Sequence, residues 1–371
     1  MKALGIILAG GNNSKMQELS NKRAIAAMPV GGSYRCIDFA LSNMSNSHIQ
    51  KVAVLTQYNA RSLNEHLSSS KWWDFGRKQG GLYVFNPTVT SDNAWWYRGT
   101  ADAMYRNLDF LKRSHEPYVV IAAGDCVYKL DYNKVLEYHI NKKADITIVC
   151  KDMPAGEDVR RFGTVKMNED SRIVEYEEKP MVAQSNTISA GIYVIRRRQL
   201  VEMLEKCAEE GRYDFVTDIL IRYKNMKRIY GYKLEEYWNN IATVESYYQT
   251  NMDFLKADVR AYFRNEPKVY SKVDDLPPAK YNVGSDVRNS LISSGCIINS
   301  KVENSILFKK VFVGKNCVIK NSIILNDVYI GDNTHIENCI VESRDTLRAN
   351  TYFSGGDGIK VVYEHNERYV I

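Results

Sequence analysis

The sequence predicts an α/β protein in two parts, a mostly parallel sheet covered by helices and then a parallel β-helix. Two observations carry this prediction. Apolar runs alternate with amphipathic stretches through the first two thirds of the 371 residues, and after about residue 283 helix signals give way to a 17-residue repeat. A chain of this length with 44% hydrophobic residues is also expected to fill more than one core.

Four apolar runs mark the expected strands of the first part. They span residues 3–8, 52–55, 118–123 and 146–149, and amphipathic stretches such as 102–111 separate them. In a mostly parallel sheet with helices on both faces, ligands bind outside the carboxyl ends of the strands. The residues that directly follow these runs are therefore the first candidates for a functional site.

The repeat after residue 283 aligns in three rows that begin at Cys296, Val313 and Ile330. An aliphatic residue every five or six positions is what a left-handed parallel β-helix of the hexapeptide type needs, because each coil stacks on the next. A β-sandwich with accidental self-similarity is the alternative. The agreeing columns are Val302, Ile319 and Ile336; Ile306, Ile323 and Ile340; Leu307, Ile324 and Val341; and Asn304, Asn321 and Asn338.

These patterns divide the chain into an α/β domain (1–245), a linker helix and connection (246–282) and the β-helix (283–371). The joining helix is expected over 244–262. The repeat fades after Leu347, as expected of a cap. We expect the β-helix to supply scaffolding or subunit contacts rather than chemistry.

Charge and hydropathy exclude some classes of function. The net charge of +6 is spread without blocks of Lys or Arg, which argues against nucleic-acid binding and suits small anionic ligands. No stretch approaches the ~20 apolar residues of a membrane span, and the first apolar run breaks at Gly10 and Gly11, unlike a cleavable signal. We therefore expect a cytoplasmic protein without a membrane partner.

Cysteine spacing argues against zinc and disulfides. The seven cysteines are scattered singly with no CxxC pair, which indicates reduced thiols in or near the cores.

Phosphate chemistry is suggested at the end of the first strand. Leu8-Ala9-Gly10-Gly11 is followed by Lys15, and such a loop lets backbone N–H groups approach a phosphate while a cation neutralises it. An ordinary turn between strand and helix would look the same.

Two further stretches strengthen the suggestion. Asp125 ends a buried strand, a usual position for a carboxylate that holds Mg²⁺ between phosphates, although a turn or a helix N-cap is the plain alternative. Gly99 and Thr100 precede a helix, where backbone groups suit base or phosphate contacts.

Eight stretches resemble bacterial ADP-glucose pyrophosphorylase (glucose-1-phosphate adenylyltransferase) in order and spacing. They are ILAGG (7–11), RCIDFALSNMSNS (35–47), TQYNARSLNEHL (56–67), WYRGTADAMYRN (96–107), AAGDCVYKLDY (122–132), RFGTV (161–165), EYEEKP (175–180) and SAGIYVI (189–195). The resemblance implies a Rossmann-like nucleotidyltransferase domain, a tetramer and allosteric control by metabolites. It also implies a reaction of glycogen biosynthesis, in which ATP and glucose 1-phosphate give ADP-glucose and pyrophosphate with Mg²⁺ as cofactor.

The resemblance also implies roles for individual residues. On the nucleotide side these are Leu8, Ala9, Gly10, Gly11, Gln57, Gly99, Thr100 and Asp125. On the sugar-phosphate side they are Gly163, Glu178, Lys179, Ser189, Gly191 and Asp218. Lys15 and Asp125 are the remaining candidates for catalysis.

The chain departs from the family pattern where charge matters most. Asn13 stands at a loop glycine, Lys15 at an arginine, Ile25 at a phosphate-facing lysine, Asn240 at the aspartate that is the second metal ligand, and Cys126 at a histidine. Lysine keeps the charge but loses the bidentate fork of arginine. Asp125 is left as the one expected metal ligand, so we expect Mg²⁺ to bind poorly.

These losses predict an impaired site, because removing one preorganised charge-stabilising donor typically costs about 10²- to 10³-fold in rate. The pattern resembles the D-type, non-catalytic subunit of this family. The sequence thus predicts a regulatory subunit in a hetero-oligomer, expected to be a tetramer, with a catalytic partner and with ATP and glucose 1-phosphate as ligands.

Two alternatives stay open. Lys15 and Asp125 could suffice for an active adenylyltransferase. A β-helix acyltransferase would need a histidine, and His335 is the only one in the repeat rows, where it is expected to face outward.

Overall fold

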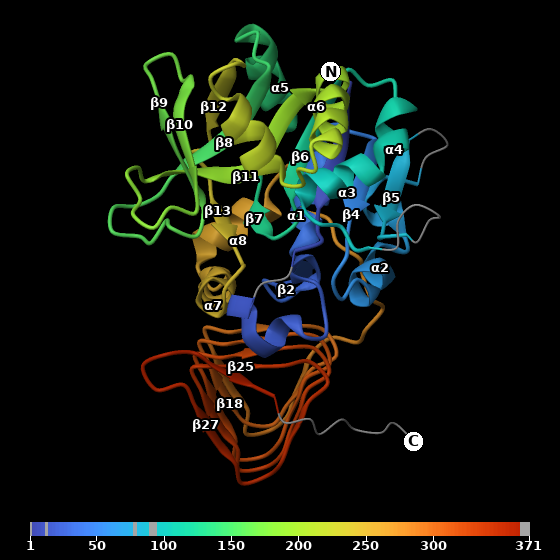
Figure 1. The fold of residues 1–371 in the computed structure, drawn as a ribbon. Coiled ribbons are helices and arrows are strands. Elements are labelled where there is room, and N and C mark those ends of the chain that lie inside the picture. The colour runs from blue at the N-terminus through green and yellow to red at the C-terminus, as the bar shows by residue number, and fades with distance from the viewer. Residues whose placement is uncertain (1, 12–13, 77–79, 89–94, 364–371) are drawn as a thin grey trace.

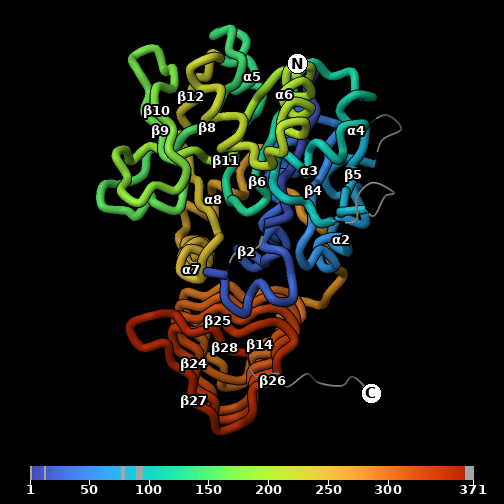
Figure 2. The backbone as a smooth tube through the Cα atoms, viewed as in Figure 1, coloured from blue at the N-terminus to red at the C-terminus, as the bar shows by residue number. Residues whose placement is uncertain are grey.

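The computed structural model describes residues 2–11, 14–76, 80–88 and 95–363. It has two parts stacked end on end, an α/β domain and a column of triangular coils beneath it (Figure 1). The tube in Figure 2 shows that the coils run straight below helix α7 (Val244–Asp253).

The α/β domain is built on a nine-stranded sheet. Its main path runs β10-β9-β11-β6-β1-β4-β5, while β8 pairs with β11 and β12 pairs with β8. The strands are β1 (Ala3–Leu8), β4 (Lys51–Leu55), β5 (Gly81–Phe85), β6 (Tyr118–Ala123), β8 (Ile146–Asp152), β9 (Gly163–Met167), β10 (Ile173–Glu178), β11 (Thr187–Arg196) and β12 (Ile229–Lys233).

The four predicted strands correspond to β1, β4, β6 and β8. Strands β5, β4, β1 and β6 are parallel to one another, as predicted. Strand β11 then enters antiparallel to both β6 and β8, an arrangement that the apolar runs did not reveal. Its buried side chains look the same in either direction, because both faces of the sheet are covered.

Helices cover both faces of the sheet. Helices α1 (Ile37–Asn46), α2 (Arg61–Leu67) and α5 (Tyr132–Asn141) bury their apolar residues on one face, and α3, α4 and α6 (Arg197–Glu209) on the other. The amphipathic stretch 102–111 forms two helices, α3 (Thr100–Arg106) and α4 (Leu108–Lys112), because Asn107 breaks it. The Asn107 amide donates to the Ala103 carbonyl at 2.8 Å and ends the first helix. None of the helices that the structure describes is long and apolar enough to cross a membrane.

Short elements join the sheet to the coils. Strand β2 pairs with β3, and β7 pairs with β13. Helix α7 begins with a capping box between Thr243 and Ser246. The predicted joining helix is two helices rather than one, since the chain turns after Asp253 and starts α8 at Ala257. The short elements are β2 (Pro29–Val30), β3 (Tyr34–Arg35), β7 (Cys126–Tyr128), β13 (Trp238–Asn240), α8 (Ala257–Arg264), the 3₁₀ turns Ser14–Ser20, Ile25–Ala27 and Ser70–Trp73, and the π-helical turn Val216–Ile221.

The second part is a parallel β-helix, as predicted, with three five-stranded sheets. The first contains β14 (Lys280–Tyr281), β17 (Ile297–Ile298), β20 (Phe312–Val313), β23 (Tyr329–Ile330) and β26 (Thr346–Leu347). The second contains β15 (Asp286–Arg288), β18 (Lys301–Glu303), β21 (Val318–Lys320), β24 (His335–Glu337) and β27 (Tyr352–Ser354). The third contains β16 (Leu291–Ile292), β19 (Ile306–Leu307), β22 (Ile323–Ile324), β25 (Cys339–Val341) and β28 (Lys360–Val362).

Repeat columns predicted from the sequence fall in register, with two corrections. The asparagine column takes positive φ at the corner, and the amides ladder from Asn289 to Asn304 (2.9 Å) and on to Asn321 (2.7 Å). Asn338 leaves the ladder and donates to the Gly356 carbonyl instead. The expected cap after Leu347 is wrong, because β27 and β28 continue the stack beyond it.

The two aliphatic columns of the third sheet serve different cores. Leu307, Ile324 and Val341 fill the inside of the coils. Ile306, Ile323 and Ile340 belong instead to a cluster with the α/β domain that includes Tyr247 and Phe254. One sheet of the β-helix is therefore buried on both faces, and its outer face joins the two parts.

We predict that Ile323→Ala lowers the free energy of unfolding by about 2–5 kcal/mol, because it opens a cavity in the seam between the two parts. Ile297→Ala is the matched control, since Ile297 is 37% exposed on another sheet and should cost under about 1 kcal/mol. Urea unfolding checks both variants. Equal costs would contradict the role given to the seam.

Candidate functional site

The predicted phosphate loop directly follows Leu8, at the carboxyl end of β1. The Ala9 N–H donates to the Leu55 carbonyl at 2.8 Å, which ties the loop to β4. A Cβ on Gly10 would lie 3.3 Å from that of Gln57, so glycine permits this close approach. Gly11 has open space around it, and Asn13 lies outside the described residues.

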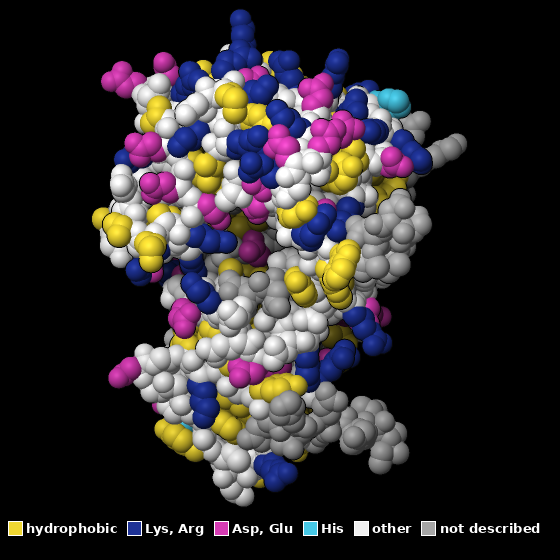
Figure 3. Space-filling model, viewed as in Figure 1, with side chains coloured by type: hydrophobic (Ala, Val, Ile, Leu, Met, Phe, Trp, Pro, Cys, Tyr) yellow, Lys and Arg dark blue, Asp and Glu magenta, His cyan; other side chains and the backbone are white. Residues whose placement is uncertain are grey.

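Lys15 starts the 3₁₀ turn Ser14–Ser20 and is exposed. It lines a cavity of about 1080 Å³ together with Asp158, Arg161 and Thr243. On this side the molecule is hollowed between the lobe of β9 and β10 and helix α3 (Figure 3). The structure thus keeps one cation of the loop at the mouth of the candidate site.

Gln57 holds the segment that leads to α3. Its side-chain amide donates to the Tyr97 carbonyl at 3.3 Å, and its side-chain oxygen accepts from the Tyr97 N–H at 2.7 Å. Both polar ends of Gln57 are therefore engaged within the chain. A direct contact of Gln57 with nucleotide stays a prediction.

The first residues of α3 are hydrogen-bonded to the segment that contains Tyr213 and Phe215. The Tyr213 carbonyl accepts from the N–H groups of Ala101 (2.8 Å) and Asp102 (3.1 Å). Thr100 Oγ1 accepts from the Phe215 N–H at 2.9 Å. Tyr213 thus occupies the N–H groups of Ala101 and Asp102, and the expected contact of Gly99 and Thr100 with a ligand stays a prediction.

In the pair of β7 and β13, Asn240 lies opposite Cys126, the residue that follows Asp125. Asn240 Oδ1 accepts from the Ala242 N–H at 3.0 Å, and Nδ2 donates to the Asp125 carbonyl at 3.4 Å. Burial, together with Asp125, raises the pKa of the Cys126 thiol well above its usual range.

These residues do not fit a magnesium pair. Mg²⁺ takes hard oxygen ligands, chiefly carboxylates, whereas Asn240 is neutral and its side-chain oxygen already accepts a backbone hydrogen bond. Among the residues that the structure describes, no three His, Cys, Asp or Glu side chains are grouped as a metal site. Asp125 is thus the single carboxylate that the sequence assigned to the metal.

Ile25 supplies no charge near the site. It opens the 3₁₀ turn Ile25–Ala27, is 5% exposed and belongs to the hydrophobic cluster that contains Met16 and Leu19. The same turn packs under the loop before Asp125, because a Cβ on Gly124 would lie 3.3 Å from that of Ala26. The side chain at position 25 is part of a core and not of a phosphate site.

On the sugar-phosphate side, the end of β10 brings two charges together. Burial raises the pKa of the Glu178 carboxyl, while Lys179, whose Nζ lies 3.5 Å from Oε1, opposes the shift. A Cβ on Gly163 would lie 2.8 Å from Glu178 Oε2, so this glycine leaves room for the carboxylate.

Strand β11 and the turn after α6 hold the other sugar-side residues. Ser189 Oγ donates to the Tyr193 hydroxyl at 3.2 Å, and Gly191 takes a φ of 73°. Asp218 Oδ2 accepts from the N–H groups of Tyr213 (3.0 Å) and Asp214 (2.9 Å). Asp218 therefore builds the turn through these two hydrogen bonds, and its expected contact with the sugar stays a prediction.

Comparison with known proteins agrees with this architecture. The sequence model described as nucleotidyl transferase matches residues 4–257, and the one described as GlmU-like, C-terminal hexapeptide matches residues 277–354. A glucose-1-phosphate adenylyltransferase of Clostridium novyi is 39% identical over 85% of this chain and 84% of its own length. The chain belongs to the glucose-1-phosphate adenylyltransferase family.

Two further relatives are similar over at least as much of this chain. The enzyme of that name from Clostridium botulinum (strain Alaska E43) is 42% identical over 98% of this chain and 95% of its own length. That from Clostridium perfringens (strain 13) is 41% identical over 85% of this chain and 81% of its own length. The family resemblance seen in the motifs thus extends through the β-helix.

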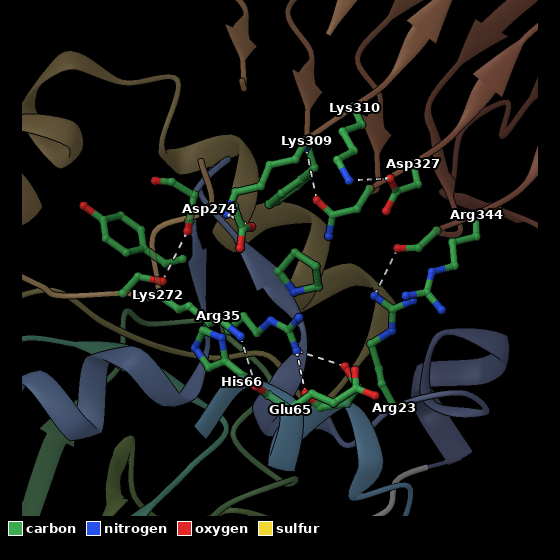
Figure 4. Close-up of a pocket in the computed structure, with 18 of the residues that line it drawn as sticks. Arg23, Arg35, Glu65, His66, Lys272, Asp274, Lys309, Lys310, Asp327 and Arg344 are labelled. Carbon is green, nitrogen blue, oxygen red and sulfur yellow. Dashed lines mark hydrogen bonds and ion pairs between the residues drawn. The ribbon is translucent and has the colours of Figure 1, made fainter. Parts of the chain in front are cut away.

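A second cavity, of about 590 Å³, lies between the two parts. Figure 4 shows Arg23 and Arg35 of the α/β domain across from Lys309, Lys310 and Arg344 of the coils. Lys22, Arg61 and Lys272 also line it, as do the carboxylates Glu65, Asp274 and Asp327. Sequence reasoning missed this basic cavity because its cations are scattered between residues 22 and 344.

The basic cavity is bridged from side to side. Arg23 forms an ion pair with the buried Glu342 and donates to Ser343 Oγ at 3.1 Å. Lys309 Nζ pairs with Asp274 at 2.7 Å. These bonds hold the coils to the α/β domain around the cavity.

We predict that Asn240→Asp creates Mg²⁺ binding. The introduced carboxylate would lie beside Asp125, whose carbonyl the Asn240 side chain contacts, so the two anions would repel until a cation lies between them. Mg²⁺ should then raise the melting temperature of this variant by several degrees and leave the unmodified chain unchanged.

Asn239→Asp is the comparison variant, because it adds the same charge one position away, where Asn239 lies opposite Val127 rather than Cys126. Stabilisation of the unmodified chain by Mg²⁺ would contradict our account of this site.

Proposed function

We propose that this chain is a non-catalytic, modulating subunit of glucose-1-phosphate adenylyltransferase in glycogen biosynthesis. The observation that carries the proposal is Asn240. Its side chain is hydrogen-bonded within the chain at the position where the resemblance expects a metal carboxylate.

The chemistry of the reaction supports the proposal. A sugar phosphate must attack a nucleotide phosphate, and both are anions, so catalysis depends on cations around the leaving pyrophosphate and on a metal between the reactants. Ile25 is buried in a hydrophobic cluster and supplies no charge. Each such loss typically costs about 10²- to 10³-fold in rate, and the two losses act on the same step.

The partner in this proposal is a catalytic subunit of the same fold, in a hetero-oligomer that we expect to be a tetramer. A subunit without chemistry can act on its partner by shifting the conformational equilibrium of the assembly. The basic cavity between the two parts supports such a role, because an anionic metabolite bound there would contact both parts.

An active adenylyltransferase is the second candidate. The names of the relatives favour it, since each is called a glucose-1-phosphate adenylyltransferase. Asp125, Glu178 and Lys179 are also retained. His335, the residue of the acyltransferase alternative, stacks on Tyr352 on the outer face of the coils.

We predict that the purified chain with ATP, glucose 1-phosphate and Mg²⁺ releases pyrophosphate at least about 10³-fold more slowly than the Clostridium perfringens relative assayed beside it. Release at a rate near that of the relative would overturn the proposal in favour of the active enzyme.

A repair variant and a mixing experiment complete this test. Ile25→Lys with Asn240→Asp should raise the rate measurably, provided that a melting curve shows the variant folded. The chain should also co-purify with a catalytic subunit and change its kinetics. A mixture with the kinetics of the catalytic subunit alone would contradict the modulating role.

A further inference from the structure

Arg161 is a half-buried cation that forms no ion pair with a carboxylate in the part of the chain that the structure describes. It lies just before β9 and lines the cavity of about 1080 Å³. Its Nη1 donates to Thr243 Oγ1 at 3.4 Å, while its buried Nε has no hydrogen-bond partner in the described part of the chain. Burial lowers the pKa of this guanidinium, with Glu157 and Asp158 only partly offsetting the effect.

The neighbouring Arg160, by contrast, forms a complete ion pair with a carboxylate. Its Nε and Nη2 donate to the two carboxylate oxygens of Asp158 at 2.8 and 2.9 Å, in a bidentate pair exposed to solvent. Arg161 forms no ion pair of this kind with any carboxylate that the structure describes. A buried guanidinium with an unused N–H is costly unless an anion completes its hydrogen bonds.

Arg161 stands between the sugar side and the altered metal side. The carbonyl of the next residue, Phe162, accepts from the Lys179 N–H at 3.2 Å, beside the predicted sugar-phosphate residues. On its other side Thr243 follows shortly after Asn240.

We propose that Arg161 binds the phosphate of a sugar 1-phosphate in this chain without any metal ion. The inference rests on the proposed function, since it gives a non-catalytic subunit a ligand. A planar guanidinium offers two parallel N–H donors that match phosphate oxygens, and its charge does not depend on a carboxylate cage. In this chain an arginine thus supplies positive charge where Asn240 no longer supports a metal.

Calorimetric titration of the full-length chain with glucose 1-phosphate tests the proposal. The dissociation constant in EDTA should equal that in Mg²⁺ within about twofold. Arg161→Gln should weaken binding roughly tenfold or more, because it removes charge-assisted hydrogen bonds. Arg160→Gln, the matched control, should change binding by less than about threefold, and Arg161→Lys should recover part of the loss.

ATP and inorganic phosphate serve as comparison ligands. The proposal expects Arg161→Gln to weaken glucose 1-phosphate far more than ATP. It is overturned if glucose 1-phosphate fails to bind, if binding requires Mg²⁺, or if Arg161→Gln, shown folded by its melting curve, binds as tightly as the unmodified chain. Pyrophosphate release is measured separately, so an active enzyme would refute the proposed function while this titration still judges Arg161.

Discussion

The pairing of β7 with β13 is the constraint on which the candidate site depends. It sets position 240 opposite Cys126 and beside Asp125, whatever residue occupies it. An aspartate there would bring two carboxylates together and would need a cation between them. The amide of Asn240 removes that need, because it donates to the Asp125 carbonyl and accepts from Ala242.

Charges of both signs change around this strand pair. Isoleucine stands where the family pattern has a phosphate-facing lysine, and asparagine where it has an aspartate. The Ile25 side chain is buried in a hydrophobic core, where a lysine would be unfavourable. The sugar side differs, since Glu178 and Lys179 keep opposite charges close together and Arg161 stays cationic beside them. Charged side chains are therefore present at the predicted sugar-phosphate residues, whereas neutral side chains stand at positions 25 and 240.

Sequence patterns predicted the parts of the fold that are encoded locally. The runs at 3–8 and 118–123 coincide with β1 and β6, and the 17-residue repeat with the coils. The antiparallel direction of β11 was not predicted, because the side chains of a strand buried on both faces do not indicate its direction relative to its neighbours. The sequence predicted the columns of Ile323 and Ile324 but not which of them faces outward. Both are aliphatic, and only the docked α/β domain distinguishes them. The hydrogen bonds from Asp218 to two backbone N–H groups were not predicted either, because backbone partners leave no trace in side-chain motifs.

Helix α7 connects the site to the β-helix through direct contacts. Its cap, Thr243, accepts from Arg161 and follows shortly after Asn240. One turn later the Tyr248 hydroxyl donates to the Asn321 carbonyl at 2.8 Å, and Tyr247 packs in the seam with Ile323. A phosphate bound by Arg161 would thus lie close to the first turn of α7, a helix that packs against the coils. Because the seam is apolar and closely packed, a shift of that helix would have to move the coils with it or open the packing between them. Contacts of this kind allow a subunit to transmit ligand binding without carrying out any chemistry.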